Sequence, residues 1–340
     1  LDISPIFRFA CGLIEARLAD RRGSLAPCLA ALRRAFAVTR ETGIDFEAYI
    51  YVLGGMMSRL AGIALAHDIE PAVVRRMIRR HGIAAPSLDA IGWPWPIRIY
   101  TLGRFVVERD DEPLRASRKE SKKVLELLKL VLAGGGAESP AKLMQALWPD
   151  AEGDHAKLSF DSTLLRLRRL IGHDGAIELK SGVVRLNRSI VWTDVAALDE
   201  LLTAIENDAA AGAAERSESA LERVLALYRG PFLPTDDQTA ALVATRDRIR
   251  ARVLRVASQV GMQLEAADRH AVAARLYARV LEQDVLAEEI YRRLIVCQLA
   301  LGQQAEAYDT FRRCRDNLSI ILGIKPSPAT QALVARLRAA

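Results

Sequence analysis

The stretch 162-STLLRLRRLIGHDGAIELKSGVVRLN-187 joins a short basic run to two apolar segments connected by Ser-Gly. Three arginines, Arg166, Arg168 and Arg169, fall within four residues, among leucines at helical spacing. The second half alternates as strands do, and a two-residue loop that contains glycine is typical of a primed β-turn. The stretch therefore predicts a helix followed by a β-hairpin at 176–187.

The predicted helix, at about 154–171, has two different faces. At 100° per residue one stripe is apolar, which predicts that it packs inside its own domain. The members of this stripe are Phe160, Leu164, Leu167 and Ile171. The opposite face carries His155, Ser159, Ser162, Arg166 and Arg169, with Thr163 and Leu165 on its flanks. Arginine can bond guanine or clamp phosphates, and Ser and Thr reach phosphates or base edges, so this face suits a DNA major groove. Arg168 lies nearer the packed side and is not expected to contact DNA.

The residues before this helix predict the rest of a small domain. Residues 97–117 alternate as three or four short strands with a turn at RDDEP, and 119–133 read as a helix. The segment SPAKLMQALWPD predicts a short helix with Ser139 as N-cap and Pro140 at its first position. The order is strands, three helices and a hairpin, and a short helix before the basic one fits helix-turn-helix geometry.

Both flanking regions are predicted to be helical. Helices are expected at 5–21, 24–42, 46–67 and 71–81, followed by the Pro-rich segment 83–97, which has linker composition. From Asp194 onward the pattern is helical apart from YRGPFLPTDD at 228–237. Two segments there superpose at an offset of 34 residues, the period of tetratricopeptide helix pairs. The offset aligns Ala273 with Ala307, where adjacent helices would approach closely, and Tyr277 with Phe311, which would fill the groove beside them.

Composition fits a mainly helical protein with a small β component. The chain has 340 residues, 51% of them hydrophobic, and a net charge of +6, which favours polyanions or acidic surfaces as partners. The four cysteines are widely separated and are expected to be small buried hydrophobes in a reducing compartment. Neither they nor the histidines have metal-ligand spacing, LAGGGAES at 132–139 lacks the Lys-Ser/Thr of a P-loop, and no catalytic triad motif is present. We therefore expect no enzyme activity, no metal and no cofactor.

The segments together resemble two bacterial domains. The segments IRIYTLGRFVV, LMQALWPD, STLLRLRRLIG and IELKSGVVRLN look like the OmpR-like winged helix of antibiotic-regulatory-protein (SARP-type) transcription activators. YRGPFLP, LGIKPSP and the sequence between them are similar to the bacterial transcriptional activation domain that accompanies it. The helical segment before the winged helix resembles the repeat region of large ATP-dependent activators of the maltose-regulator type. That resemblance implies a cytoplasmic fragment whose nucleotide-binding domain would lie upstream.

The resemblance implies a domain division and a function. It gives a helical-repeat segment at 1–90, a linker at 91–96, a winged-helix DNA-binding domain at 97–192 and a tetratricopeptide-like activation domain at 193–340. It implies a regulator, expected to be an activator, that binds double-stranded promoter DNA, recruits RNA polymerase and forms a homo-oligomer on DNA. Ser159, Ser162, Thr163, Arg166 and Arg169 map to the recognition helix, and Lys180 and Arg185 to the wing. A receiver domain with a phosphorylatable aspartate is not seen, so control by phosphorylation is not supported.

Two other functions fit the same residues. The chain could be a protein–protein scaffold whose winged helix is a docking module that does not bind DNA. A membrane-surface role would need a broad apolar stripe on the 154–171 helix, whereas the stripe is narrow and suits an intramolecular core. The steep salt dependence of phosphate contacts would separate DNA binding from the scaffold.

Overall fold

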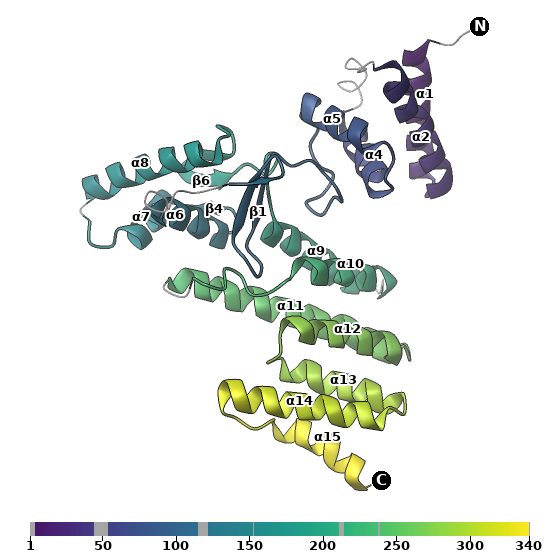
Figure 1. The fold of residues 1–340 in the computed structure, drawn as a ribbon, viewed down its shortest axis with the longest axis vertical. Coiled ribbons are helices and arrows are strands. Elements are labelled where there is room, and N and C mark those ends of the chain that lie inside the picture. The colour runs from purple at the N-terminus through teal and green to yellow at the C-terminus, as the bar shows by residue number, and fades with distance from the viewer. Residues whose placement is uncertain are drawn as a thin grey trace. The chain divides into compact units, whose positions relative to one another are not determined.

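The structure, a computed structural model, describes residues 4–43, 54–114, 122–151, 153–210, 214–236 and 239–339. Most of these residues are helical and two small sheets accompany them, which confirms the predicted mainly α composition (Figure 1). The chain forms two compact units. Unit 1 comprises Leu1–Arg98, Glu108–Pro113 and Asn187–Trp192, and unit 2 comprises Ile99–Val107, Leu114–Leu186 and Thr193–Ala340. Among the described helices, none is both long and apolar enough to cross a bilayer.

Unit 1 contains four described helices. They are α1 (Pro5–Arg21), α2 (Leu25–Thr42), α4 (Gly54–Ala66) and α5 (Pro71–His81), which confirms the helices predicted at 5–21, 24–42 and 71–81. For the helix predicted at 46–67, residues 46–53 lie outside the described residues. Helices α1 and α2 approach closely at Gly12, where a Cβ atom would lie 2.9 Å from the Ala35 Cβ. Phe9 and Phe36 meet edge to face nearby, with their ring centroids 6.3 Å apart.

The Pro-rich segment at 83–97, predicted as a linker, packs inside unit 1. Trp93 and Trp95 are buried, and the Trp192 indole Nε1–H donates a hydrogen bond to the Leu88 carbonyl at 2.6 Å. The Arg98 guanidinium donates to the Trp93 carbonyl at 2.8 Å. Burial of two large indole side chains stabilises an irregular segment that has no helix or strand of its own before residue 97.

Two small sheets are present. The first has the order β3-β2-β1-β7, formed by β1 (Ile97–Tyr100), β2 (Val106–Arg109), β3 (Glu112–Pro113) and β7 (Val191–Thr193). The predicted turn between β2 and β3 is present, with Asp110 and Asp111 at positive φ. The second sheet has the order β4-β6-β5, from β4 (Ala137–Glu138), β5 (Ile177–Lys180) and β6 (Val183–Leu186). The sequence did not predict β4 and β7, which have only two and three residues.

Three helices in unit 2 lie between these strands in the chain. They are α6 (Lys122–Ala133), α7 (Pro140–Leu147) and α8 (Gly153–Ile171). The predicted start of α7 is confirmed, because the Ser139 hydroxyl accepts a hydrogen bond from the Lys142 N–H at 3.4 Å and Pro140 opens the helix. For the helix predicted at 119–133, residues 119–121 lie outside the described residues. The predicted order of strands, three helices and hairpin is therefore observed.

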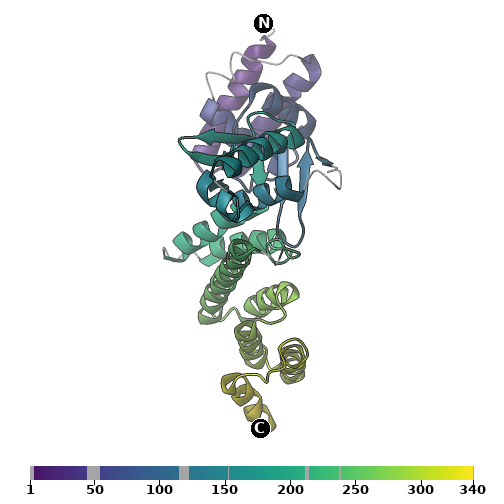
Figure 2. The same ribbon diagram turned by 90° about the vertical axis from the view of Figure 1, so that its left-hand side faces the viewer.

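Seven helices complete unit 2. They are α9 (Asp194–Ala210), α10 (Ala214–Leu227), α11 (Ala240–Ala266), α12 (His270–Gln283), α13 (Glu288–Ala300), α14 (Gln304–Leu322) and α15 (Pro328–Ala339). Helices α11 to α15 lie side by side in chain order (Figures 1 and 2). The starts of α12 and α14 and the ends of α11 and α13 are each 34 residues apart, as the superposed segments predicted.

The small residues of the two superposed segments lie where helices meet. Ala273, Ala307 and Tyr277 are fully buried, and Gly261 leaves the space that the Tyr277 ring occupies. The Tyr277 hydroxyl donates to the Glu265 carboxylate at 2.6 Å. Phe311 is half-buried and is therefore less enclosed than Tyr277.

The segment 228–236 joins the strand end at 101–103 to the C-terminal helices. The Gly103 N–H donates to the Pro231 carbonyl at 2.9 Å, and the Leu233 N–H donates to the Thr101 carbonyl at 2.8 Å. A Cβ atom at Gly103 would lie 2.8 Å from the Arg229 carbonyl oxygen, so only glycine permits this approach. On the other side, the Lys129 ammonium of α6 bonds the Asp236 carboxylate at 2.7 Å.

Asp194 fixes the start of α9 on the same strand end. Its buried carboxylate accepts hydrogen bonds from the Thr101 N–H and hydroxyl, both at 2.7 Å, and from the Leu102 and Val195 N–H groups at 2.8 Å. Burial raises the pKa of the Asp194 carboxyl above its usual value, and the four donated hydrogen bonds oppose that shift. The carboxylate therefore connects residues 101–102 to the first turn of α9.

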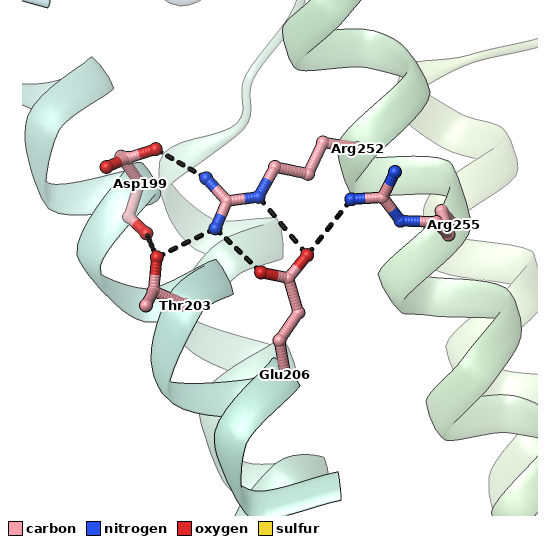
Figure 3. A network of polar contacts seen from close by, with 5 residues as sticks. All are labelled: Asp199, Thr203, Glu206, Arg252 and Arg255. Atoms are coloured by element: carbon pink, nitrogen blue, oxygen red, sulfur yellow. Dashed lines mark hydrogen bonds and ion pairs between the residues drawn. The ribbon is translucent and has the colours of Figure 1, made fainter. Parts of the chain in front are cut away.

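Farther along, α9 is held on α11 by an ion network (Figure 3). The Arg252 guanidinium contacts the Asp199 carboxylate, and donates to the Thr203 hydroxyl at 2.7 Å and to the Glu206 carboxylate at 2.8 Å. These acceptors lie on successive turns of α9. Arg255 also bonds Glu206, and the two guanidinium groups hold the pKa of that carboxyl below its ordinary value.

The predicted burial of the cysteines is confirmed for three of the four. Cys28, Cys297 and Cys314 are buried, whereas Cys11 is exposed. Because of burial, the pKa of the Cys297 and Cys314 thiols rises to about 12, and the pKa of Cys28 is also raised. Only Cys11 departs from the prediction.

We predict that iodoacetamide at mildly alkaline pH alkylates Cys11 and leaves the other three cysteines unmodified. Buried thiols with a raised pKa hold little thiolate, which is the reactive form. Mass spectrometry of peptides measures the modification, and the same reaction in guanidinium chloride is the control in which all four should react. Equal modification of Cys297 and Cys11 in the native protein would contradict the burial.

We expect Asp194→Ala to lower the free energy of unfolding by about 3 kcal/mol, because four donors lose their acceptor. Urea denaturation followed by circular dichroism measures the change. The matched control is Asp199→Ala on the same helix, whose carboxylate is exposed and should cost under about 1 kcal/mol. Equal stability of the two variants would show that the Asp194 carboxylate is not a structural link.

Candidate nucleic-acid interface

Helix α8 packs on α6 and α7 through one side. The buried residues of this side are Ala156, Phe160, Thr163, Leu164, Leu167 and Ile171. All four residues of the predicted apolar stripe are among them, so the stripe is confirmed. In Figure 1 α8 lies along one side of unit 2, and Figure 2 turns that side toward the viewer. The other side of the helix is exposed.

The turn from α7 to α8 is fixed by a lysine of α6. The Lys123 ammonium donates a hydrogen bond to the Leu147 carbonyl at 2.6 Å and lies 5.8 Å from the centre of the Trp148 ring. A cation at the last carbonyls of a helix also interacts favourably with the helix dipole. This contact ties the end of α7 to α6 just before α8 begins. Lys123 was not singled out from the sequence, because its contact depends on the tertiary packing.

The outward side of α8 carries most of the residues expected there. His155, Ser162, Arg166 and Arg169 are exposed, and Ser159 is half-buried. Among the residues that the structure describes, Arg166 and Arg169 have no hydrogen-bond or ion-pair partner. Two guanidinium groups on adjacent turns are therefore available to an anionic ligand.

Thr163 does not lie on this exposed side. It is 8% exposed, and its hydroxyl donates a hydrogen bond to the Ser159 carbonyl at 2.7 Å. At 100° per residue Thr163 lies about 40° from Leu167, at the border of the apolar stripe, and its side chain is buried. The sequence placed the Thr163 side chain on the flank of the outward face, whereas the structure buries it on the packed side.

Arg168 differs from the two arginines beside it. Its Nε–H donates a hydrogen bond to the Ile177 carbonyl at 3.0 Å, and the side chain is half-buried. Ile177 opens strand β5, so Arg168 holds the hairpin to the end of α8. The expectation that Arg168 lies nearer the packed side is confirmed.

The hairpin presents its two basic residues on one face. Ser181 and Gly182 form the tip, both at positive φ, as a primed turn requires. Lys180 lies opposite Val183 and Glu178 opposite Arg185, which places Lys180 and Arg185 on the same face. Both side chains are exposed, whereas Val184 and Leu186 on the other face are buried.

Strand β4 completes the base of this hairpin. Ala137 pairs with Arg185 and Glu138 with Val184, and the Leu186 N–H donates to the Gly136 carbonyl at 2.8 Å. The glycine-rich segment after α6 turns the chain, with Gly135 and Gly136 at positive φ. Its pairing with β6, about 50 residues later, was not predicted because a two-residue strand has no periodicity to detect.

The exposed basic side chains of this region lie on two elements. Arg166 and Arg169 come from α8, and Lys180 and Arg185 from the hairpin that Arg168 attaches to α8. Two further outward residues of α8 are apolar, Leu158 and Leu165, and only Leu165 was noted from the sequence. Within the described residues no group of three or more His, Cys, Asp or Glu side chains could hold a metal ion.

Residues 193–338 match the family model of the bacterial transcriptional activator domain. The chain is also similar to the Streptomyces griseus regulatory protein AfsR, with 25% identity over 71% of this chain and 24% of AfsR. It is similar to the Mycobacterium tuberculosis transcriptional regulatory protein EmbR, with 26% identity over 69% of this chain and 62% of EmbR.

A solved structure has a related fold. The M. tuberculosis EmbR structure in complex with a low affinity phosphopeptide aligns with a TM-score of 0.53 and 21% identity, over 72% of this chain and 65% of that chain. The chain thus spans about a quarter of AfsR and less than two thirds of EmbR. Residues 193–338 are thus similar to the bacterial transcriptional activator domain, and about 70% of the chain is similar to the regulators AfsR and EmbR.

Proposed function

We propose that the chain is a sequence-specific DNA-binding transcription regulator, acting as an activator, in which α8 enters the major groove. The observation that carries the proposal is the division among three neighbouring arginines. Arg168 bonds the hairpin, while Arg166 and Arg169 are exposed and have no partner among the described residues. Arginine in that state can bond guanine O6 and N7 or clamp a phosphate.

The dimensions of α8 suit this role. A helix of 19 residues is about 28 Å long, and the major groove of DNA admits an α-helix. Ser159 and Ser162 add short donors beside the arginines. We assign base or phosphate contacts to Ser159, Ser162, Arg166 and Arg169, and we leave out Thr163 because its hydroxyl is bonded within the helix.

The β5–β6 hairpin is proposed as the wing of a winged helix-turn-helix. Its tip is a two-residue turn, and Lys180 and Arg185 share one exposed face beside it. A narrow basic tip of this kind can reach an adjacent minor groove or the phosphate backbone. The contact from Arg168 would hold the wing at a fixed angle to the recognition helix.

We propose that residues 97–192 act as the DNA-binding domain and 193–340 as the activation domain, with 1–90 as a separate helical-repeat segment. The family match at 193–338 and the 34-residue spacing of α12 and α14 support a tetratricopeptide-like activation domain. Stacked helix pairs offer extended protein-binding surfaces. We infer that this domain contacts RNA polymerase or a second copy of the chain on promoter DNA.

The test begins with duplexes selected from random-sequence DNA by the purified chain. We expect Arg166→Ala and Arg169→Ala each to cost about 1–3 kcal/mol of binding to the selected duplex, roughly 5- to 150-fold in Kd. Fluorescence anisotropy over a salt series measures Kd and its slope, which should be about −0.9 per phosphate neutralised. The control is Arg312→Ala/Arg315→Ala on α14, which removes the same charge from two exposed, ion-paired arginines.

DNA affinity that is unchanged in the Arg166→Ala/Arg169→Ala variant, with the fold intact by circular dichroism, would overturn the proposal. If no duplex is enriched and binding shows no salt dependence, the hairpin and helices would instead serve as a protein-docking module. An equal loss in the α14 control would indicate only a general charge effect.

A separate prediction concerns the wing. Arg168→Ala should lower the free energy of unfolding by about 1.5 kcal/mol, because a charge-assisted hydrogen bond to Ile177 is lost. Hydrogen exchange should become faster in β5 and β6. Arg169→Ala is the matched control and should change the stability by less than about 0.5 kcal/mol. Unchanged exchange in the hairpin of Arg168→Ala would show that this arginine does not hold it.

A further inference from the structure

Two leucines are exposed on the outward side of α8. Leu158 is 69% exposed and Leu165 is 47% exposed. They are seven residues apart, so their directions differ by only about 20° around the helix. Single exposed leucines are common on protein surfaces and need no explanation. These two share one strip of a single helix.

The strip lies along one border of the proposed DNA-binding face, next to Arg169 and Ser162. At 100° per residue, Leu158, Ser162, Leu165 and Arg169 fall within an arc of about 60°, opposite the packed stripe. Arg166 lies about 40° beyond this arc, on the side of Ser162. A ligand that contacts Arg169 and Ser162 would therefore also cover the two leucines. Apolar side chains next to these polar ones suit a ligand that offers an apolar group beside its polar groups.

We propose that Leu158 and Leu165 read thymine through its C5-methyl group. This inference rests on the proposed function and adds the class of base that the leucine strip selects. The thymine methyl is the apolar group that base pairs present in the major groove, and leucine can contact it while making no hydrogen bond. Ser162, which lies between the leucines in the sequence, and Arg169, one turn after Leu165, supply the polar contacts to neighbouring bases.

The spacing of the leucines sets the expected spacing of the thymines. Seven residues at 1.5 Å rise separate Leu158 and Leu165 by about 10 Å along the helix axis. Base pairs are stacked about 3.4 Å apart. Two thymines separated by at most about three base steps are therefore the expected common feature of the selected duplexes, because inclination of the helix to the DNA axis shortens the separation.

The arginines favour DNA over a protein partner for this strip. Docking of an apolar protein surface on the leucines would also bury the guanidinium groups of Arg166 and Arg169, and buried charges without partners are costly. A DNA groove offers both the apolar methyl groups and the anionic or acceptor groups that the arginines need. One ligand then satisfies all four side chains.

The experiment replaces thymidine by deoxyuridine in the selected duplex, which removes the C5-methyl group and leaves base pairing and the minor groove unchanged. Kd is measured by fluorescence anisotropy for each single replacement. We expect the wild-type chain to bind about fourfold more weakly for each methyl removed from the two thymines, the value of one buried methyl-sized group. Replacement of thymidines outside the selected site should have no effect.

The leucine variants complete a double-mutant cycle, in which one change removes the leucines and the other removes the thymine methyl groups. The Leu158→Ala/Leu165→Ala variant should bind the thymidine and deoxyuridine duplexes with the same Kd, because it lacks the leucines that contact the C5-methyl groups. Alanine is the best helix former, so α8 should remain folded. The control is Ile320→Ala on α14, which is 82% exposed in the wild type and should keep the fourfold preference for thymidine.

The outcomes separate this inference from the proposed function. Salt-dependent binding that requires Arg166 and Arg169 but ignores the methyl groups would overturn the thymine assignment and leave DNA binding intact. A leucine variant that binds both duplexes more weakly but keeps the fourfold preference for thymidine would also overturn the thymine assignment. So would a leucine variant that alters only self-association, because the leucines would then belong to a protein contact. Absence of DNA binding in the wild-type chain would overturn the proposed function itself.

Discussion

The Asp194 carboxylate is the constraint on which the arrangement of unit 2 depends. It accepts four hydrogen bonds, three from residues 101–102 and one from the start of α9. A buried carboxylate without donors would be strongly destabilising, so this strand end and this helix start must form together. The close approach at Gly103 and the Lys129–Asp236 ion pair act on the same junction. The three-helix segment and the C-terminal helices are thereby packed as one unit.

Hydrogen-bond geometry also divides the three arginines of α8 into one with a structural role and two that are exposed. Consecutive residues point about 100° apart, and Arg168 points toward the hairpin whereas Arg169 points outward. Arg168 reaches a backbone carbonyl of β5, where its donor replaces a missing strand partner. Arg169 and Arg166 point outward, where the structure describes no acceptor for them. A basic run of this kind is therefore part structural and part available for a ligand, and composition alone does not separate the two.

Features determined by local sequence were predictable, and features determined by distant contacts were not. The Ser139 cap, the Ser181-Gly182 turn and the apolar stripe of α8 follow from residues within a few positions of one another. Thr163 was placed on the flank of the outward face, but it lies at the boundary of the two faces and is buried, with its hydroxyl bonded to the Ser159 carbonyl. The pairing of β4 with β6 and the packing of Gly103 against Arg229 join residues far apart in the chain, and no local pattern encodes them.

Affinity and selectivity at the α8 face would have different physical origins. Attraction between guanidinium groups and phosphates is nearly independent of sequence, so it supplies affinity and salt dependence but little discrimination. Discrimination needs side chains held in a fixed position against base edges. Packing of α8 on α6 and α7, the Lys123 contact at the preceding turn and the Arg168 bond to the hairpin hold this helix before any ligand arrives. Since the helix and the hairpin are already ordered, binding costs little conformational entropy. The free energy of the few groove contacts can then discriminate between DNA sequences.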